Sequence, residues 1–194
     1  MKIYKNYNVG LKMVFKTISL ISTIVLFSLN YLNAQVYVAD SCSVSFFSSA
    51  PLEDIEAVST MPKGSTYSAF NTSTGKLAFK IPIKSFRFAN GLMEEHFNEN
   101  YMESDKYPYA SFKGILSTDN EYESAKAEGV FNIHGVEQQR GFVGAWIKSG
   151  EKRILKGEFI VQTKDHKIKI PKLLIKNIAE EIKVNVYCEF AIKK

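Results

Sequence analysis

One stretch near the C-terminus decides the fold class: Ile182-Lys183-Val184-Asn185-Val186-Tyr187-Cys188-Glu189-Phe190-Ala191-Ile192. Every even position holds an apolar side chain, whereas Lys183, Asn185 and Glu189 stand at odd positions. Side chains of a β-strand point alternately to opposite faces, so this period of two predicts a strand with one buried and one solvated face.

The same alternation recurs through most of the chain. It predicts five further inward rows, which are Val36, Val38, Cys42, Val44 and Phe46; Leu77, Phe79, Ile81 and Ile83; Ala110, Phe112, Gly114 and Leu116; Ala127, Gly129, Phe131 and Ile133; and Leu155, Gly157, Phe159 and Val161. Segments 55–60 and 66–71 are predicted as two more strands, and 142–147 as another whose facing stays open because both parities are apolar. Pro82 has no N–H to donate, so we expect an edge or a bulge at that point.

Strands with one wet and one dry face are typical of antiparallel sheets rather than of parallel α/β sheets. The chain is therefore expected to be all-β, either a sandwich or a closed barrel. An eight-stranded barrel has an interior that side chains can fill or that can hold one small ligand. Glycines beside phenylalanines on the inward rows, as at Gly129 and Phe131, fit a tapered packed core and fit room for a guest equally well.

Residues 90–106 break the strand rhythm. The segment is rich in acidic residues, lacks period-two alternation and ends before Tyr107-Pro108, which predicts one or two short helices or turns between strands. Its apolar side chains indicate a lid over one barrel opening, and the alternative is a crossover packed on the outside. We expect Leu92, Met93, Phe97 and Met102 to shield that end.

Residues 1–34 have the pattern of a signal peptide. Lysines precede the apolar run from Ile18 to Leu32, and Ala34 is a small residue suited to the cleavage site. The alternative is an uncleaved anchor, but the run is short for a span of about 20 residues and contains several polar residues. We therefore expect residues 35–194 to form the mature domain, exported to the periplasm or secreted and not membrane-spanning after cleavage.

The basic character of the chain resides in this leader. The whole sequence has 25 basic and 20 acidic residues, and four of the lysines lie in residues 1–34, which leaves 21 basic against 20 acidic residues. The mature domain thus has a net charge near +1, which argues against a nucleic-acid partner.

Two cysteines remain in the mature domain, Cys42 and Cys188, each on the inward parity of its strand. Exported proteins retain disulfides, and the first and last strands of a closed barrel can be neighbours, so the two sulfurs could meet. They could equally be two separate buried thiols, because strand register cannot be read from sequence.

Motifs of catalysis and metal binding are not found. The histidines His96, His134 and His166 are isolated, without the spacing of a metalloprotease or a catalytic-cysteine context. We expect His134 to face outward at a turn and His96 to hydrogen-bond within its loop. Trp146 is predicted to pack in the core or to line a tunnel. The chain is thus expected to be no enzyme and to need neither metal nor cofactor.

Two segments carry a family resemblance. Residues 92–102 followed by Lys106-Tyr107-Pro108-Tyr109-Ala110-Ser111-Phe112-Lys113-Gly114, and then Phe131-Asn132-Ile133-His134-Gly135-Val136-Glu137, resemble the loop, strand and turn of the YceI-like family in order and spacing. This resemblance implies an antiparallel eight-stranded lipocalin-like β-barrel with a short helical insertion between strands. It also implies an apolar tunnel that binds a polyisoprenoid or another long-chain amphiphilic lipid.

The resemblance and the inward rows together give the expected ligand-binding residues. They are Phe46, Phe79, Ile81, Leu92, Met93, Phe97, Phe112, Phe131, Ile133, Trp146, Phe159 and Val186. The competing hypothesis is a barrel with a filled interior that serves as a structural or partner-binding module of the envelope. The sequence does not fix the oligomeric state, and a homodimer stays open.

Overall fold

The computed structural model describes residues 35–49, 52, 54–61, 68–119, 123–170 and 179–193. The expected signal peptide, residues 1–34, lies outside the described residues, as do parts of the segment expected as a strand at 66–71.

Strands dominate the described residues, and one short helical segment interrupts them. The elements are β1 (Val36–Ser49), β2 (Asp54–Met61), β3 (Ala69–Asn71), β4 (Lys76–Pro82), the 3-10 helix η1 (Ile83–Ser85), β5 (Phe86–Phe88), α2 (Gly91–His96), the π-helical turn η2 (Phe97–Tyr101), β6 (Tyr109–Asp119), β7 (Ser124–Ile133), β8 (Val136–Ser149), β9 (Lys152–Gln162), the 3-10 helix η3 (Thr163–His166) and β10 (Glu181–Ile192).

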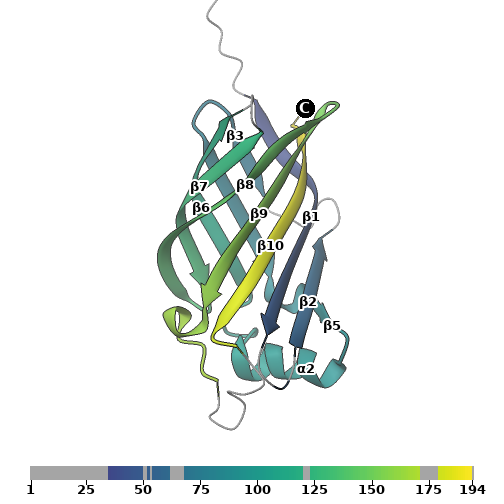
Figure 1. Cartoon of the computed structure of the whole chain (residues 1–194), viewed down its shortest axis with the longest axis vertical. Helices are drawn as coiled ribbons and strands as arrows, with labels where there is room; N and C mark the ends of the chain where they lie inside the picture. Colours follow the sequence, from purple (N-terminus) through teal and green to yellow (C-terminus); the bar gives the residue numbers. More distant parts are fainter. Residues whose placement is uncertain are drawn as a thin grey trace, which may run out of the picture. The chain divides into compact units, whose positions relative to one another are not determined.

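Eight strands close into an antiparallel barrel (Figure 1). The circuit runs β1–β3–β4–β6–β7–β8–β9–β10 and returns to β1 through the β10–β1 pairing. β1 is long enough to pair with β3 near its start and with β2 along its second half, and β2 in turn pairs with β5. The predicted eight-stranded antiparallel barrel is confirmed, with β2 and β5 as a branch at one end.

A β-bulge in β1 changes which side chains face inward. The register with β10 shifts between Ala39 and Ser41, so Tyr37 and Ala39 are buried before the bulge, and Cys42 and Val44 are buried after it. The prediction that Val36 and Val38 share the inward row with Cys42 was therefore wrong. One extra residue at a bulge reverses the facing of everything before it.

The bulge also aligns the two cysteines. Cys42 stands directly opposite Cys188 in the β1–β10 ladder, with their Cα atoms 4.1 Å apart, and the two form a disulfide. Of the two alternatives that the sequence left open, the structure has the bridge. The disulfide thus joins the first and last strands of the barrel.

Side chains fill the interior of the barrel at one end, which we call the packed end. Trp146 lies at its centre, with ring centroids 5.8 Å from Tyr37, 5.0 Å from Phe70 and 5.5 Å from Phe190. Phe190 and Leu155 are fully buried beside it. This end contains the disulfide and leaves the opposite end, near α2, to form the site.

Two inward glycines have separate reasons for being small. At Gly129 a Cβ would collide with the backbone of Lys113, because β6 and β7 approach closely where Gly114 pairs with Gly129. At Gly157 a Cβ would lie 2.7 Å from the ring of Phe142, so the glycine makes room for that side chain. Pro82, expected at an edge or a bulge, is instead the last residue of β4, paired with Tyr109.

Candidate functional site

The end of the barrel near α2, opposite the packed end that contains Trp146, is hollow. It encloses a cavity of about 190 Å³, and the described residues that line it include no charged side chain. The polar groups on its wall are the hydroxyls of Ser48, Ser111, Thr163 and Tyr101. Burial raises the pKa of the Tyr101 hydroxyl, which keeps that group neutral. An interior of this kind favours an apolar guest.

Phenylalanines from neighbouring strands form much of the cavity wall. Phe79 pairs with Phe112, and Phe112 pairs with Phe131, so strand register stacks three rings at one height of the barrel. The ring centroids of Phe112 and Phe131 are 4.7 Å apart, and those of Phe131 and Phe159 are 4.8 Å apart. All four rings point inward, as their parity predicted.

The segment from Gly91 to Met102, which we call the lid segment, closes the hollow end. Asn90 starts its helix, since the Asn90 side chain accepts a hydrogen bond from the Leu92 amide at 2.9 Å. An ion pair between Arg87 and Glu94 at 2.8 Å holds the helix against β5. The predicted short helices are confirmed.

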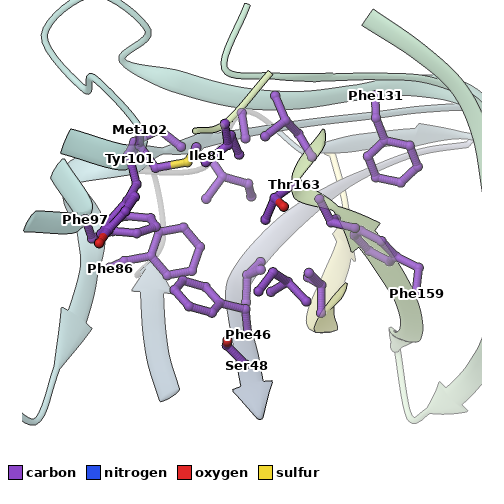
Figure 2. Close-up of a pocket in the computed structure, with 18 of the residues that line it drawn as sticks. Phe46, Ser48, Ile81, Phe86, Phe97, Tyr101, Met102, Phe131, Phe159 and Thr163 are labelled. Atoms are coloured by element: carbon purple, nitrogen blue, oxygen red, sulfur yellow. The ribbon is translucent and has the colours of Figure 1, made fainter. Parts of the chain in front are cut away.

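Aromatic packing seals the contact between the lid segment and the barrel. The ring of Phe97 lies 5.4 Å from Phe46, 5.7 Å from Phe86 and 5.1 Å from Phe88. Figure 2 shows Phe97, Tyr101 and Met102 on one side of the cavity, with Phe131 and Phe159 on the opposite side. The segment therefore covers one barrel opening rather than packing on the outside as a simple crossover.

Most of the residues expected at the site do line the cavity. These are Phe46, Phe79, Ile81, Met93, Phe97, Phe112, Phe131, Ile133, Phe159 and Val186. That any of them contacts a ligand stays a prediction.

Two residues that were expected at the site, Leu92 and Trp146, do not line the cavity. Leu92 is 58% exposed and does not line the cavity, because it falls on the outer side of a short helical segment that turns Met93 and Phe97 toward the cavity instead. Trp146 is 3% exposed and lies in the packed end, since its register on β8 places it opposite Leu155 and away from the hollow.

Sequence reasoning also missed part of the lining. Ile182 and Val184 share the inward parity of Val186, and Val161 shares that of Phe159, so the alternation could have found them. Phe86 and Phe88 flank the lid segment and have no such signal. Val44, Ile83 and Ala110 stand on the predicted inward rows, and Met102 was expected to shield this end, although none of the four was among the expected ligand-binding residues. The remaining lining residues are Ser48, Ile55, Tyr101, Ser111, Phe142, Thr163, Ile168 and Ile170.

A polar cluster, which we call the rim latch (Glu103, His134 and His166), joins the end of the lid segment to the barrel rim. Nε2 of His134 lies 2.8 Å from Oε2 of Glu103, and Nδ1 of His134 lies 3.0 Å from the backbone oxygen of His166. The hydrogen bond from His134 lowers the pKa of the Glu103 carboxyl. Burial lowers the pKa of His166, whose Nδ1 donates to the Val136 carbonyl at 3.3 Å.

The expectation that His134 faces outward was wrong. His134 is 8% exposed and adopts a positive φ of 53° at the β7–β8 turn, which directs its ring back toward the lid segment and Tyr107. Gly135 follows at φ 72°, and a Cβ there would strike the Tyr107 ring. The turn chemistry, rather than the strand parity, sets the direction of the ring.

The described residues contain neither a metal-type cluster nor a membrane-spanning helix. No cluster of three or more histidine, cysteine, aspartate or glutamate side chains has the arrangement of a metal site. No helix in the same part of the chain is both long enough and apolar enough to cross a membrane.

Comparison with known proteins decides the family. The model of the YceI-like domain matches residues 37–190, which is nearly the whole barrel. The chain belongs to the YceI-like family. A comparison with curated proteins finds no match.

Solved structures have the same fold at low sequence identity. BcnA of Burkholderia cenocepacia has a TM-score of 0.65 at 14% identity, covering 76% of this chain and 95% of that one. A polyisoprenoid binding domain from Saccharophagus degradans, implicated in plant cell wall breakdown, has a TM-score of 0.63 at 12% identity, covering 82% and 99%. The YceI protein of Campylobacter jejuni has a TM-score of 0.55 at 19% identity, covering 67% and 81%. This YceI-like chain thus shares their barrel.

Proposed function

We propose that this YceI-like protein binds a long-chain apolar amphiphile of the polyisoprenoid type in the hollow half of its barrel. It holds the lipid for sequestration or transport and does not catalyse a reaction on it. The observation that carries the proposal is the cavity wall, in which phenylalanine, isoleucine and valine side chains surround the space without a charged group. The polyisoprenoid binding domain of Saccharophagus degradans, which has a similar fold, supports the lipid class.

The energetics of burial favour such a ligand. Each CH₂ group moved from water into an apolar site contributes about 0.8 kcal/mol before ordering costs. A net value of about 0.3 kcal/mol per heavy atom gives roughly 9 kcal/mol for a thirty-carbon chain. Sub-micromolar affinity then requires no special polar chemistry in the cavity.

The cavity volume bears on how the chain fits. The space of about 190 Å³ is smaller than the roughly 300–1,000 Å³ of pockets that hold small molecules. A long chain therefore needs the flexible side chains of the lid segment, including Met93 and Met102, to move aside. Methionine suits this role because its unbranched side chain adapts to variable contents.

We further propose that the protein acts outside the cytoplasm, in the periplasm or as a secreted protein. The leader-like residues 1–34 support this location, and a Cys42–Cys188 disulfide is compatible with an oxidising compartment. N-terminal sequencing of the exported protein tests it, with Gln35 expected as the first residue.

Lipid binding is tested directly by extracting the purified full-length mature protein with organic solvent and by native mass spectrometry. We expect a co-purifying amphiphile, or saturable uptake of a fluorescent prenyl probe. A clean apo mass together with no uptake would instead favour the packed structural module. Phe131→Ala should weaken uptake, and Ile115→Ala on the outer face should not.

A further inference from the structure

The barrel wall contains an unpaired stretch between β8 and β9. The two strands are paired only from Val143 opposite Glu158 to Ser149 opposite Lys152. β8 nevertheless begins at Val136, paired to β7 throughout, and β9 continues to Gln162, paired to β10. Figure 1 shows the corresponding half of β8 bending away from β9.

A surface hollow lies beside this unpaired stretch and borders the cavity. A hollow of about 820 Å³ lies here, and part of its lining is shared with the interior cavity. The shared side chains are Phe131, Ile133, Phe142, Phe159 and Val161. These side chains therefore border both the apolar interior and the hollow on the outer surface. We call this hollow the side opening.

The outer rim of the side opening is amphipathic. Val143 is 67% exposed and Ile160 is 51% exposed, which places apolar surface at the mouth. Lys126, Arg140 and Lys164 lie around them, together with Glu158 and Asp165.

The rim of the side opening has one more basic than acidic side chain. Arg140 pairs with Asp165, Lys126 with Glu128, and Lys183 with Glu158. Lys164 is exposed and forms none of the ion pairs found in the described part of the chain. An anionic group that reaches this rim would find one cation without a competing carboxylate.

Both ends of the barrel are closed more firmly than the side. Trp146, Phe190 and their neighbours fill the packed end. At the other end Phe97 packs on three phenylalanines, and the Arg87–Glu94 ion pair and the rim latch hold the lid segment down. At the side opening, by contrast, the described residues of β8 before Val143 and of β9 after Glu158 are not paired with each other, so passage there leaves the lid segment in place.

We propose that the amphiphile enters and exits the cavity through the side opening. When it is bound, its chain lies in the cavity and its anionic, phosphate-type head remains at the side opening. This inference rests on the proposed function. Burying an ionised group in the uncharged cavity would offset much of the free energy that burial of the chain contributes, so the head is more stable in contact with water. The side opening supplies water, the Lys164 ammonium and an apolar mouth for the first carbons of the chain.

A blocking experiment tests the route. The variants Ile160→Cys and Ile115→Cys each carry one free thiol, since the native cysteines are bonded to each other, and each is labelled with a bulky maleimide. Ile115 is the matched control, because it is a similarly exposed isoleucine, at 47%, on β6. Labelling at position 160 should slow uptake and release of a fluorescent twenty-carbon prenyl phosphate on the order of tenfold, and labelling at position 115 should not.

A third labelled variant, Leu92→Cys on the lid segment, identifies the competing route. Slower exchange with the label at position 92 and unchanged exchange with the label at position 160 would overturn the proposal. No binding by the unmodified protein would overturn the proposed function, and the route with it. Binding with equal rates for labels at positions 160 and 115 would overturn the route alone.

A charge experiment tests the position of the head. Lys164→Glu should weaken binding of the prenyl phosphate about fivefold and leave the uncharged prenol of equal length unaffected, as expected for an exposed charge pair. Lys113→Glu, an exposed lysine on β6, is the control and should change neither. Equal affinity of the Lys164→Glu variant and the unmodified protein for the phosphate would place the head elsewhere.

Discussion

Nε2 of His134 lies 2.8 Å from Oε2 of Glu103, across the boundary between the barrel rim and the end of the lid segment. Nδ1 of the same ring lies 3.0 Å from the carbonyl oxygen of His166. Both partners of the ring are acceptor oxygens, one from a side-chain carboxylate and one from the backbone. One ring thus ties together the β7–β8 turn, η3 and the residue that follows the lid segment.

Removing the carboxylate should loosen the lid segment. Glu103→Gln exchanges a charge-assisted hydrogen bond for a neutral one, so we expect amides of residues 91–101 to exchange with deuterium about two- to fivefold faster. Glu99→Gln is the control, because Glu99 is exposed on the same segment and forms no ion pair among the described residues. Equal exchange in both variants would show that the rim latch does not hold the lid.

Acid should destabilise the barrel through His166. Burial lowers the pKa of His166 from its ordinary 6.5. Just below pH 6.5, His166 is therefore protonated more in the unfolded chain than in the folded barrel. The free energy of unfolding is therefore highest, as far as His166 is concerned, above pH 6.5, and it decreases as the pH falls below that value. Glu103 acts with the same sign in a more acidic range, since its pKa is also lowered.

The urea midpoint of unfolding, measured between about pH 7.5 and pH 5.5, checks this pH dependence. It should fall in the unmodified protein and fall less in His166→Gln. His96→Gln, which changes a histidine of the lid segment, should keep the unmodified slope. Parallel curves for all three proteins would contradict the assignment to His166.

Ligand binding should reduce local opening of the lid segment. Met93, Phe97 and Met102 line the cavity, so a bound chain would pack against them and reduce local opening. Hydrogen exchange across residues 90–106 is therefore expected to slow when a prenyl probe is bound. Identical exchange with and without the probe would mean that the segment does not sense the cavity contents.

The two halves of the barrel should respond differently to the same substitution. Phe190→Ala removes a fully buried ring from the packed end and should cost about 3–5 kcal/mol, with little effect on probe affinity. Phe131→Ala opens space beside an existing cavity, so it should cost less and should weaken binding. Chemical unfolding and fluorescence titration measure both; a larger loss of stability for Phe131→Ala would reverse the assignment.

The disulfide should contribute substantially to stability. Cys42 and Cys188 are separated by 146 positions, and the chain-entropy treatment then gives about 4–5 kcal/mol. We expect no free thiols in the denatured, unreduced protein, a monomeric band without reductant, and a clearly lower unfolding midpoint for the double variant to alanine. Two thiols per chain would rule the bridge out.

The alternation of apolar and polar residues was enough to predict the barrel strands and most of their inward faces. Parity gives the facing of a side chain, because successive residues of a strand point to opposite sides whatever the strand pairs with. It failed at the bulge in β1, where one extra residue moved Tyr37 and Ala39 inward in place of Val36 and Val38. It also failed beyond the strands, where left-handed backbone at His134 redirected the ring.

Parity could not give the height of a side chain along the barrel, and height separates core from site. Phe190 and Val186 share one strand and one face, yet Phe190 is buried in the packed end and Val186 lines the cavity. For the same reason the sequence left open whether Trp146 packs in the core or lines the tunnel, and whether Cys42 pairs with Cys188. Register is fixed by the stagger of all the strands around the closed barrel, which depends on contacts distant in sequence. The sequence by itself thus determined an all-β chain with an apolar interior, and only the tertiary structure decided which half is filled, which half is hollow and where the wall opens.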